Sequence, residues 1–160
     1  AHLFAGRTTL DRFPVEQFIG KASVIDCSDL QEGQAISMEH IRKIGDKIKA
    51  ADFLLFHLGW DKRWGTDAYF GDYPCIDEDV LNFILSGNYK GIGFDVIGLD
   101  PIADENLTRH KKLFQKCDIV NIENLKNLEL CGSDLFWFSC FPLKLDNCDG
   151  SPVRAVAWFE

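Results

Sequence analysis

The sequence lacks any hydrophobic run that approaches 18 residues, so no membrane-spanning helix is expected. It also lacks a C-x-x-C pair, although it contains six cysteines, which argues against both a zinc ribbon and a compact disulfide framework. Reduced thiols in a cytoplasmic protein are the favoured interpretation. The even number of cysteines leaves disulfides open as an alternative.

Positive charge is scarce as well. The 160 residues contain 17 Lys and Arg against 25 Asp and Glu, which gives a formal net charge of −8. This negative balance disfavours nucleic acid and anionic membranes as partners, because both are bound by clustered basic side chains. A phosphate-binding glycine loop is missing too, since Gly91-Ile92-Gly93 lacks the third glycine and the helix start of such a motif.

The apolar fraction of 46% and the 13 Phe residues predict a well-buried core. No internal repeat, linker or low-complexity segment divides the chain. We therefore expect residues 1–160 to form a single domain.

Short apolar runs alternate with helical patterns along the chain. Amphipathic helices are predicted from the N-cap Ser37 through Ile48 and from the N-cap Asp77 to Gly87, and a third helix-like stretch covers residues 106–114. The runs that predict strands are 22–27, 53–57, 91–96, 119–123, 135–138 and 153–157. The β-α-β-α-β order indicates an α/β domain with parallel pairing, and the last two strands should pair antiparallel.

His110 and Glu123 are the candidates for a metal site. His110 lies in the third helical stretch, and Glu123 closes an apolar run. Imidazole and carboxylate groups are suitable ligands for zinc or manganese, but a catalytic site usually takes three protein ligands and keeps one position open. From the residues alone two alternatives remain: His110 as a surface imidazole, and Glu123 as a first-turn acid of a helix over residues 124–128.

Other polar residues have plainer interpretations. His40 is expected on the solvated face of the first helix, and His57 is expected to pack or to hydrogen-bond the backbone within its strand. Asp95 and Asp100 flank Gly98 and are interpreted as structural acids of a turn.

Seven blocks of sequence, in order, resemble the cyclase family of metal-dependent hydrolases, which includes bacterial kynurenine formamidase and isatin hydrolase. They are HLF at 2–4 with FPVEQFIG at 13–20, VID at 24–26, LGWD at 58–61, GFDVIGLD at 93–100, His110 with IENL at 122–125, PLK at 142–144 and DGSPVRA at 149–155. Each block is weak alone, and the resemblance rests on their order and spacing over nearly the whole chain.

The family signature is H-x-G-T-H-x-D-x-P-x-H, and Ala1 and His2 match its last two positions. In the family, the first two His and the Asp bind the catalytic metal, and the final His, matching His2, is the acid/base residue. A later His and Glu, matching His110 and Glu123, complete a second metal position in two-metal members. The resemblance implies that the sequence begins inside a longer family member, so residues 1–160 alone should hold little metal and show negligible formamidase turnover.

The resemblance also implies a fold and a reaction. The fold is a swivelling β/β/α domain with a mixed, partly closed sheet. The reaction is metal-dependent hydrolysis of a C–N amide bond in a small aromatic substrate, such as the N-formylkynurenine of tryptophan catabolism or a cyclic amide. Zinc or manganese is the implied ion, and a homodimer or homotetramer is the implied assembly.

Amide hydrolysis explains why these residue types are needed. A divalent ion lowers the pKa of a bound water towards about 7 and polarises the carbonyl. A histidine such as His2 can take the proton of that water and return it to the leaving nitrogen, typically worth about 10²–10⁴-fold.

Four aromatic residues are candidates for substrate binding: Trp60, Trp64, Tyr69 and Phe70, in a glycine-containing connection. Aromatic walls suit a planar aryl substrate. The alternative is a hydrophobic loop that is buried at a subunit interface.

Two other functions remain open. The first alternative is a catalytically inactive family member that serves as a structural or binding protein. The second is a hydrolase that acts on a different cyclic amide or on a lactone. Metal content discriminates the first from the enzyme, and a panel of formyl-aryl amides, isatin and lactones discriminates the second.

Overall fold

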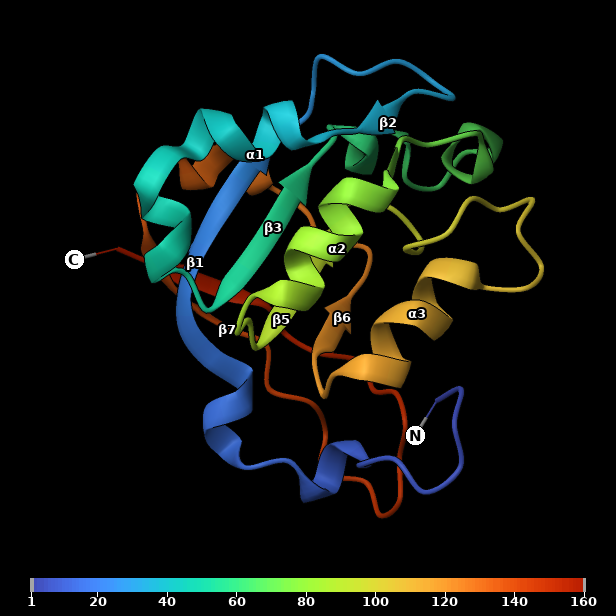
Figure 1. The fold of residues 1–160 in the computed structure, drawn as a ribbon, viewed down its shortest axis with the longest axis vertical. Helices are drawn as coiled ribbons and strands as arrows, with labels where there is room; N and C mark the ends of the chain where they lie inside the picture. The colour runs from blue at the N-terminus through green and yellow to red at the C-terminus, as the bar shows by residue number, and fades with distance from the viewer. Residues whose placement is uncertain (1, 160) are drawn as a thin grey trace.

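A computed structural model describes residues 2–159 of the chain (Figure 1). Its centre is a six-stranded mixed sheet. In sheet order the strands are β6 (Val120–Ile122), β5 (Gly91–Phe94), β3 (Phe53–His57), β1 (Ile19–Asp26), β7 (Phe136–Ser139) and β8 (Val156–Trp158). Strands β1, β3, β5 and β6 are parallel, and β7 and β8 pair antiparallel to their neighbours. The predicted α/β class and the pairing of the six predicted strands in one sheet are confirmed.

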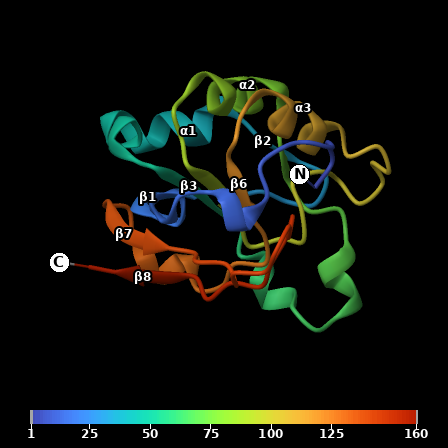
Figure 2. The same ribbon diagram turned by 90° about the horizontal axis from the view of Figure 1, so that it is seen from below.

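Three α-helices connect the parallel strands, and Figure 2 shows them together on one side of the sheet. They are α1 (Met38–Ile44), α2 (Glu78–Ser86) and α3 (Thr108–Lys116). Short 3₁₀ helices occupy the connections: η1 (Leu10–Arg12), η2 (Val15–Phe18), η3 (Gly45–Ala50), η4 (Trp60–Arg63), η5 (Asp67–Phe70) and η6 (Leu128–Cys131). Strands β2 (Ala35–Ile36) and β4 (Cys75–Ile76) form a separate parallel pair.

Both faces of the sheet are buried. Along β3 the side chains alternate, so that Leu54 and Phe56 belong to the core beneath the α-helices, whereas Phe53 and Leu55 belong to a second core. The second core is completed by residues of β7 and of the segment after β6, including Phe136, Phe138 and Leu125. A strand that is covered on both faces reads as a continuous apolar run, which explains the FLLF sequence of β3.

Strand β5 has no room for a side chain at two of its positions, Gly91 and Gly93. A Cβ atom on Gly91 would lie 2.7 Å from the Phe53 ring, and one on Gly93 would lie 2.6 Å from Leu125 Cδ1. Because side chains of β3 and of the loop after β6 fill these positions, only glycine fits. This packing fixes β5 between β3 and β6. The candidate site lies at the carboxyl ends of these strands.

The first predicted helix differs from expectation in two respects. The α-helix ends at Ile44 because Gly45 has a positive φ of 67°, and the chain continues as η3, which still buries Ile48. His40 is buried rather than solvated, so that prediction is wrong. Its Nδ1 accepts a hydrogen bond from the Ser37 backbone N–H at 3.3 Å, which places the ring at the helix start instead of in solvent.

The carboxyl ends of the parallel strands meet at one edge of the sheet. Strand β6 is followed directly by Glu123, and β5 is followed by the loop that carries Asp100 and leads into α3. Ligands commonly bind at this edge in open α/β sheets. The topology therefore brings Glu123 and the start of α3 together.

Candidate functional site

His110 is held by a buried carboxylate at the start of α3. Its Nδ1 lies 2.6 Å from Asp100 Oδ2, and the side chain of Asp100 is only 2% exposed. The same carboxylate accepts the backbone N–H groups of Arg109 at 2.6 Å and of His110 at 3.1 Å. Asp100 thus satisfies helix-start donors that have no partner within the helix, and it fixes the imidazole ring at the same time.

The other ring nitrogen of His110 faces Glu123. His110 Nε2 lies 3.2 Å from Glu123 Oε1, which also accepts a hydrogen bond of 2.9 Å from Asn121 Nδ2. A Cβ atom on Gly98 would lie 3.6 Å from that carboxylate oxygen and 3.8 Å from His110 Cε1. The backbone at Gly98 therefore packs closely against both groups.

These contacts set the charges at the site. Burial alone lowers the pKa of His110, but the hydrogen bonds and charges of Asp100 and Glu123 outweigh it and raise the pKa to about 9. Burial raises the pKa of Asp100, and the hydrogen bonds from His110 and from two backbone N–H groups outweigh that effect and hold it below the ordinary value. The two neighbouring carboxyl groups therefore favour the charged form of the His110 ring.

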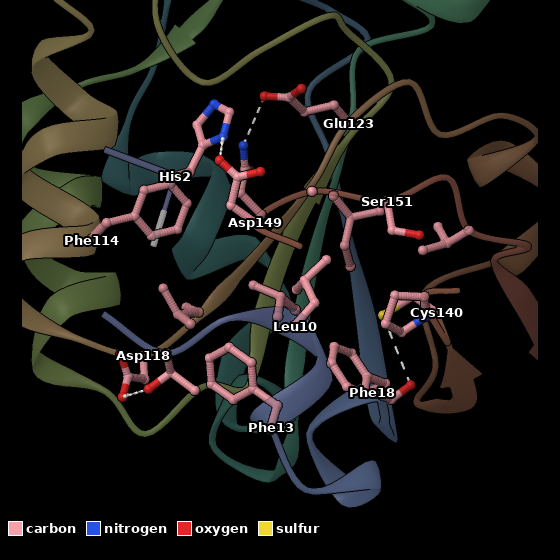
Figure 3. Close-up of a pocket in the computed structure, with 18 of the residues that line it drawn as sticks. His2, Leu10, Phe13, Phe18, Phe114, Asp118, Glu123, Cys140, Asp149 and Ser151 are labelled. Carbon is pink, nitrogen blue, oxygen red and sulfur yellow. Dashed lines mark hydrogen bonds and ion pairs between the residues drawn. The ribbon is translucent and has the colours of Figure 1, made fainter. Parts of the chain in front are cut away.

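His2, His110 and Glu123 line one cavity of about 490 Å³. They also line an adjoining cavity of about 320 Å³. His2 Nδ1 lies 3.0 Å from Asp149 Oδ2, and the side chain of His2 is 58% exposed. In Figure 3, His2, Asp149 and Glu123 lie at the same end of the cavity. The structure thus brings His2, from the first residues of the sequence, to the same cavity as His110 of α3 and Glu123 after β6.

The four aromatic candidates for substrate binding all lie in the connection between β3 and β4. Trp60 and Tyr69 are buried, Trp64 and Phe70 are exposed, and none of the four lines either of the two cavities. Trp60 Nε1 donates to the Tyr69 carbonyl oxygen at 2.9 Å, so the connection folds back on itself. Two contacts run from this connection towards the site. Tyr69 Oη donates to Asn124 Oδ1 at 2.6 Å, and the Trp60 ring packs edge to face on Tyr73, whose Oη donates to the Asp100 carbonyl oxygen at 2.5 Å.

Three further site residues were missed from the sequence: Asp100, Asn121 and Asp149. The sequence pattern indicates a turn acid at Asp100. In the structure this residue lies within the loop between β5 and α3, and its carboxylate accepts the backbone N–H of Arg109 in the first turn of α3. Asn121 is displayed beside Glu123 by the two-residue period of β6. Nothing local in the sequence indicates that Asp149 meets His2, because they are joined only by the fold.

Two donors at the site have the chemistry that a divalent ion takes, namely His110 Nε2 and Glu123 Oε1. The Nδ1–H of His110 is directed to Asp100, an arrangement that typically orients metal-binding histidines. Within residues 2–159, however, no group of three or more His, Cys, Asp or Glu side chains is placed to hold an ion. The described residues therefore fit part of a metal site.

A family model described as "Putative cyclase" matches residues 1–101, more than half of the sequence. The chain is also 30% identical over 152 residues to the kynurenine formamidase of Bacillus thuringiensis, a match that covers 94% of this chain and 68% of that protein. This chain belongs to the cyclase family. His110 and Glu123 lie beyond the residues that the family model matches.

Solved structures share the fold of this cyclase-family chain. An isatin hydrolase bound to the product analogue thioisatinate superposes with a TM-score of 0.82 at 24% identity, covering 93% of this chain and 63% of that one. A potential metal-dependent hydrolase with cyclase activity gives a TM-score of 0.71 at 23% identity, covering 98% and 73%. The chain therefore spans about two thirds of the length of the proteins that it matches.

No helix within residues 2–159 combines the length and apolarity that crossing a membrane requires.

Proposed function

We propose that this chain takes part in metal-dependent hydrolysis of a C–N amide bond in a small aromatic substrate, as an arylformamidase of the cyclase family does. The observation that carries the proposal is the approach of His110 Nε2 to Glu123 Oε1, at 3.2 Å, on the wall of a cavity that His2 also lines. Family membership and the name of the formamidase relative support the reaction class.

His110 and Glu123 are the residues that would hold the ion. A bound zinc or manganese ion would lower the pKa of a water molecule and polarise the substrate carbonyl. His110 keeps its Nδ1 proton on Asp100, which leaves Nε2 as the donor atom after that nitrogen loses its proton. Because a metal replaces this proton, binding should release protons and should weaken as pH falls.

His2 is proposed to move protons at the same end of the cavity. With Nδ1–H donated to Asp149, the Nε2 atom is the free acceptor for a proton from the attacking water. The same atom can return that proton to the leaving nitrogen. The exposure of His2 leaves its ring free to adjust to a substrate.

The test joins an upstream segment with the sequence H-x-G-T-H-x-D-x-P to residues 1–160 and measures hydrolysis of N-formylkynurenine with added zinc or manganese. We expect turnover that falls about 10²–10⁴-fold in His2→Ala, the range typical of a proton-transfer residue. Leu130→Ala, at an exposed position outside the cavities, serves as the control. Full activity of His2→Ala, or no turnover by any metal-loaded form, would contradict the proposal.

A non-catalytic binding protein is the second candidate. Metal content distinguishes it from the enzyme, because the enzyme requires a bound ion. Hydrolysis of a lactone or another cyclic amide is distinguished by assaying isatin and lactones beside the formamide.

We also propose a homo-oligomer, a dimer or tetramer. Its support is the row of exposed apolar side chains near the end of the chain, on and around the edge strand β8: Val153, Val156, Trp158 and Phe159. Exposed apolar clusters of this kind often mark interfaces. Light scattering of the purified chain, compared with Trp158→Glu, tests it: the variant should be smaller, and a monomeric parent chain would contradict the proposal.

A further inference from the structure

Tyr69 contacts the turn that directly follows Glu123. Its hydroxyl group donates to Asn124 Oδ1 at 2.6 Å, and the whole residue is only 3% exposed. Asn124 has a positive φ of 59°, a conformation that asparagine tolerates better than most residues, and its backbone N–H donates to the Val96 carbonyl oxygen at 2.9 Å. Because Glu123 lies between β6 and this left-handed residue, the contacts of Asn124 restrain the backbone that carries the Glu123 carboxylate.

Tyr73 contacts the residue that orients His110. Its hydroxyl group, also buried, donates to the Asp100 carbonyl oxygen at 2.5 Å, and the Asp100 carboxylate contacts His110 Nδ1. A Cβ atom on Gly98 would lie 3.5 Å from Tyr73 Oη and 3.6 Å from Glu123 Oε1, so the backbone there packs against the hydroxyl group and a candidate ligand together. Tyr73 therefore restrains the loop between β5 and α3 at the residue on which the His110 ring depends.

Trp60 links the two tyrosines to each other and to the end of β5. Its Nε1 donates to the Tyr69 carbonyl oxygen at 2.9 Å, and its ring meets that of Tyr73 edge to face with centroids 6.1 Å apart. The backbone N–H groups of Leu58 and Trp60 donate to the carboxylate of Asp95, at 3.0 and 3.1 Å. Asp95 directly follows β5 and is 1% exposed. The two tyrosines therefore belong to one packed support that is anchored at the carboxyl end of β5.

Both tyrosine hydroxyl groups remain donors near neutral pH. Burial, together with the charges of Asp95 and Glu123, raises the pKa of Tyr69 to about 12, and burial also raises the pKa of Tyr73. A buried donor without an acceptor is costly, so each hydroxyl group favours the backbone position that keeps its acceptor in place. Tyrosines that served only the core could be replaced by phenylalanine without any effect on the candidate ligands.

We propose that Tyr69 and Tyr73 are positioning residues of the candidate metal site. Tyr69 directs Glu123 through the neighbouring Asn124. Tyr73 directs His110 through the buried aspartate that contacts the ring. This inference rests on the proposed function, because the two restrained side chains are those proposed to hold the ion. It gives the connection between β3 and β4 a role in supporting the ligands, distinct from contact with a substrate.

The first test follows the two candidate ligands separately in the metal-free chain of 160 residues. Carbon-13 and nitrogen-15 NMR record the Glu123 carboxyl carbon and the His110 ring nitrogens. We expect Tyr69→Phe to shift mainly the Glu123 signal and Tyr73→Phe to shift mainly the His110 signals. The control is Tyr89→Phe, which removes the third tyrosine hydroxyl of the chain at a position that lines neither cavity and should shift neither signal.

The second test measures zinc affinity by competition in the chain joined to a segment with H-x-G-T-H-x-D-x-P. We expect Tyr69→Phe and Tyr73→Phe each to weaken zinc binding about three- to tenfold, less than the roughly 10–100-fold of residues that contact a ligand directly. Tyr89→Phe should bind zinc as the parent does. Urea unfolding verifies that each variant is folded, so that a loss of affinity is not a loss of structure.

A double-mutant cycle tests the route through Asn124. Asn124→Gly keeps the left-handed backbone available while it removes the acceptor of the Tyr69 hydroxyl. Because both changes break the same contact, the double variant should weaken zinc binding no more than the weaker-binding single variant does. Losses that multiply would mean that Tyr69 does not act through Asn124, and would overturn that half of the assignment.

Failure of the two proposals can be told apart. Zinc binding that depends on both tyrosines, without amide turnover, would contradict the proposed reaction alone. Unchanged NMR signals and unchanged zinc affinity in the folded phenylalanine variants would overturn the positioning role, even if the joined chain hydrolyses N-formylkynurenine. If the joined chain holds no zinc, the NMR comparison in the metal-free chain decides the positioning role by itself.

Discussion

The two histidines at the polar end of the cavity are held in opposite ways. His110 is nearly buried, with one ring nitrogen on Asp100 and the other facing Glu123. His2 is more than half exposed and meets a single exposed carboxylate, that of Asp149. A ring fixed on both sides suits a constant task such as holding an ion, whereas a ring held on one side keeps a nitrogen free for proton transfer.

The largest effect should follow from removing the carboxylate beneath His110. Asp100→Ala leaves two backbone N–H groups and an imidazole nitrogen without a partner, and breaking a buried pair typically costs about 3–5 kcal/mol. Urea unfolding measures this loss in the free energy of unfolding. The control is Asp77→Ala, which removes the cap of α2 and should cost about 1 kcal/mol. Equal losses in the free energy of unfolding for the two variants would contradict the prediction that Asp100 contributes more than an ordinary helix cap.

The pH dependence of stability should show the same contrast. The pKa of His110 is raised from 6.5 to about 9 in the folded chain. Because the folded value is the higher one, its stabilisation is fully present below pH 6.5 and is lost as pH rises through about 9. This loss amounts to about 3 kcal/mol for the metal-free chain. Unfolding measured between pH 6 and pH 9.5 should show the loss in the parent and in His2→Ala, but not in His110→Gln. If the parent, His2→Ala and His110→Gln showed the same pH dependence of the free energy of unfolding, the raised pKa of His110 would be refuted.

The smallest effect on stability should come from His2. Its ion pair with Asp149 is exposed, and exposed pairs typically contribute about 0–1 kcal/mol, so His2→Ala should change the free energy of unfolding by less than about 0.5 kcal/mol. The same denaturation experiment provides this comparison. A loss of several kcal/mol would mean that His2 is a structural residue and would remove the contrast with His110.

Part of this arrangement was predictable from the sequence. Apolar runs and caps located the six strands of the main sheet, and parallel order alone brings Glu123 and the start of α3 to one edge. Two-residue strands such as β2 and β4 carry too little pattern to be predicted.

The rest depended on tertiary packing. The loop that follows β5 turns Asp100 back onto the first turn of α3, and no local pattern distinguishes this from a simple turn. Aromatic composition likewise does not distinguish a cavity wall from a core. Trp60 and Tyr69 are core residues, whereas the aromatic lining of the cavity comes from Phe13, Phe18 and Phe114.

The most direct test of the central claim is a zinc competition titration. It compares residues 1–160, the same chain joined to a segment with H-x-G-T-H-x-D-x-P, and the joined chain carrying His110→Ala or Glu123→Gln. With two donors, the chain of 160 residues should lose its zinc to a chelator, and the joined chain should retain it. Each variant should weaken binding at least tenfold, since even residues that only support metal ligands typically contribute about 10–100-fold. A 160-residue chain that keeps one equivalent of zinc through chelator dialysis, or variants that bind as tightly as the parent, would contradict the account.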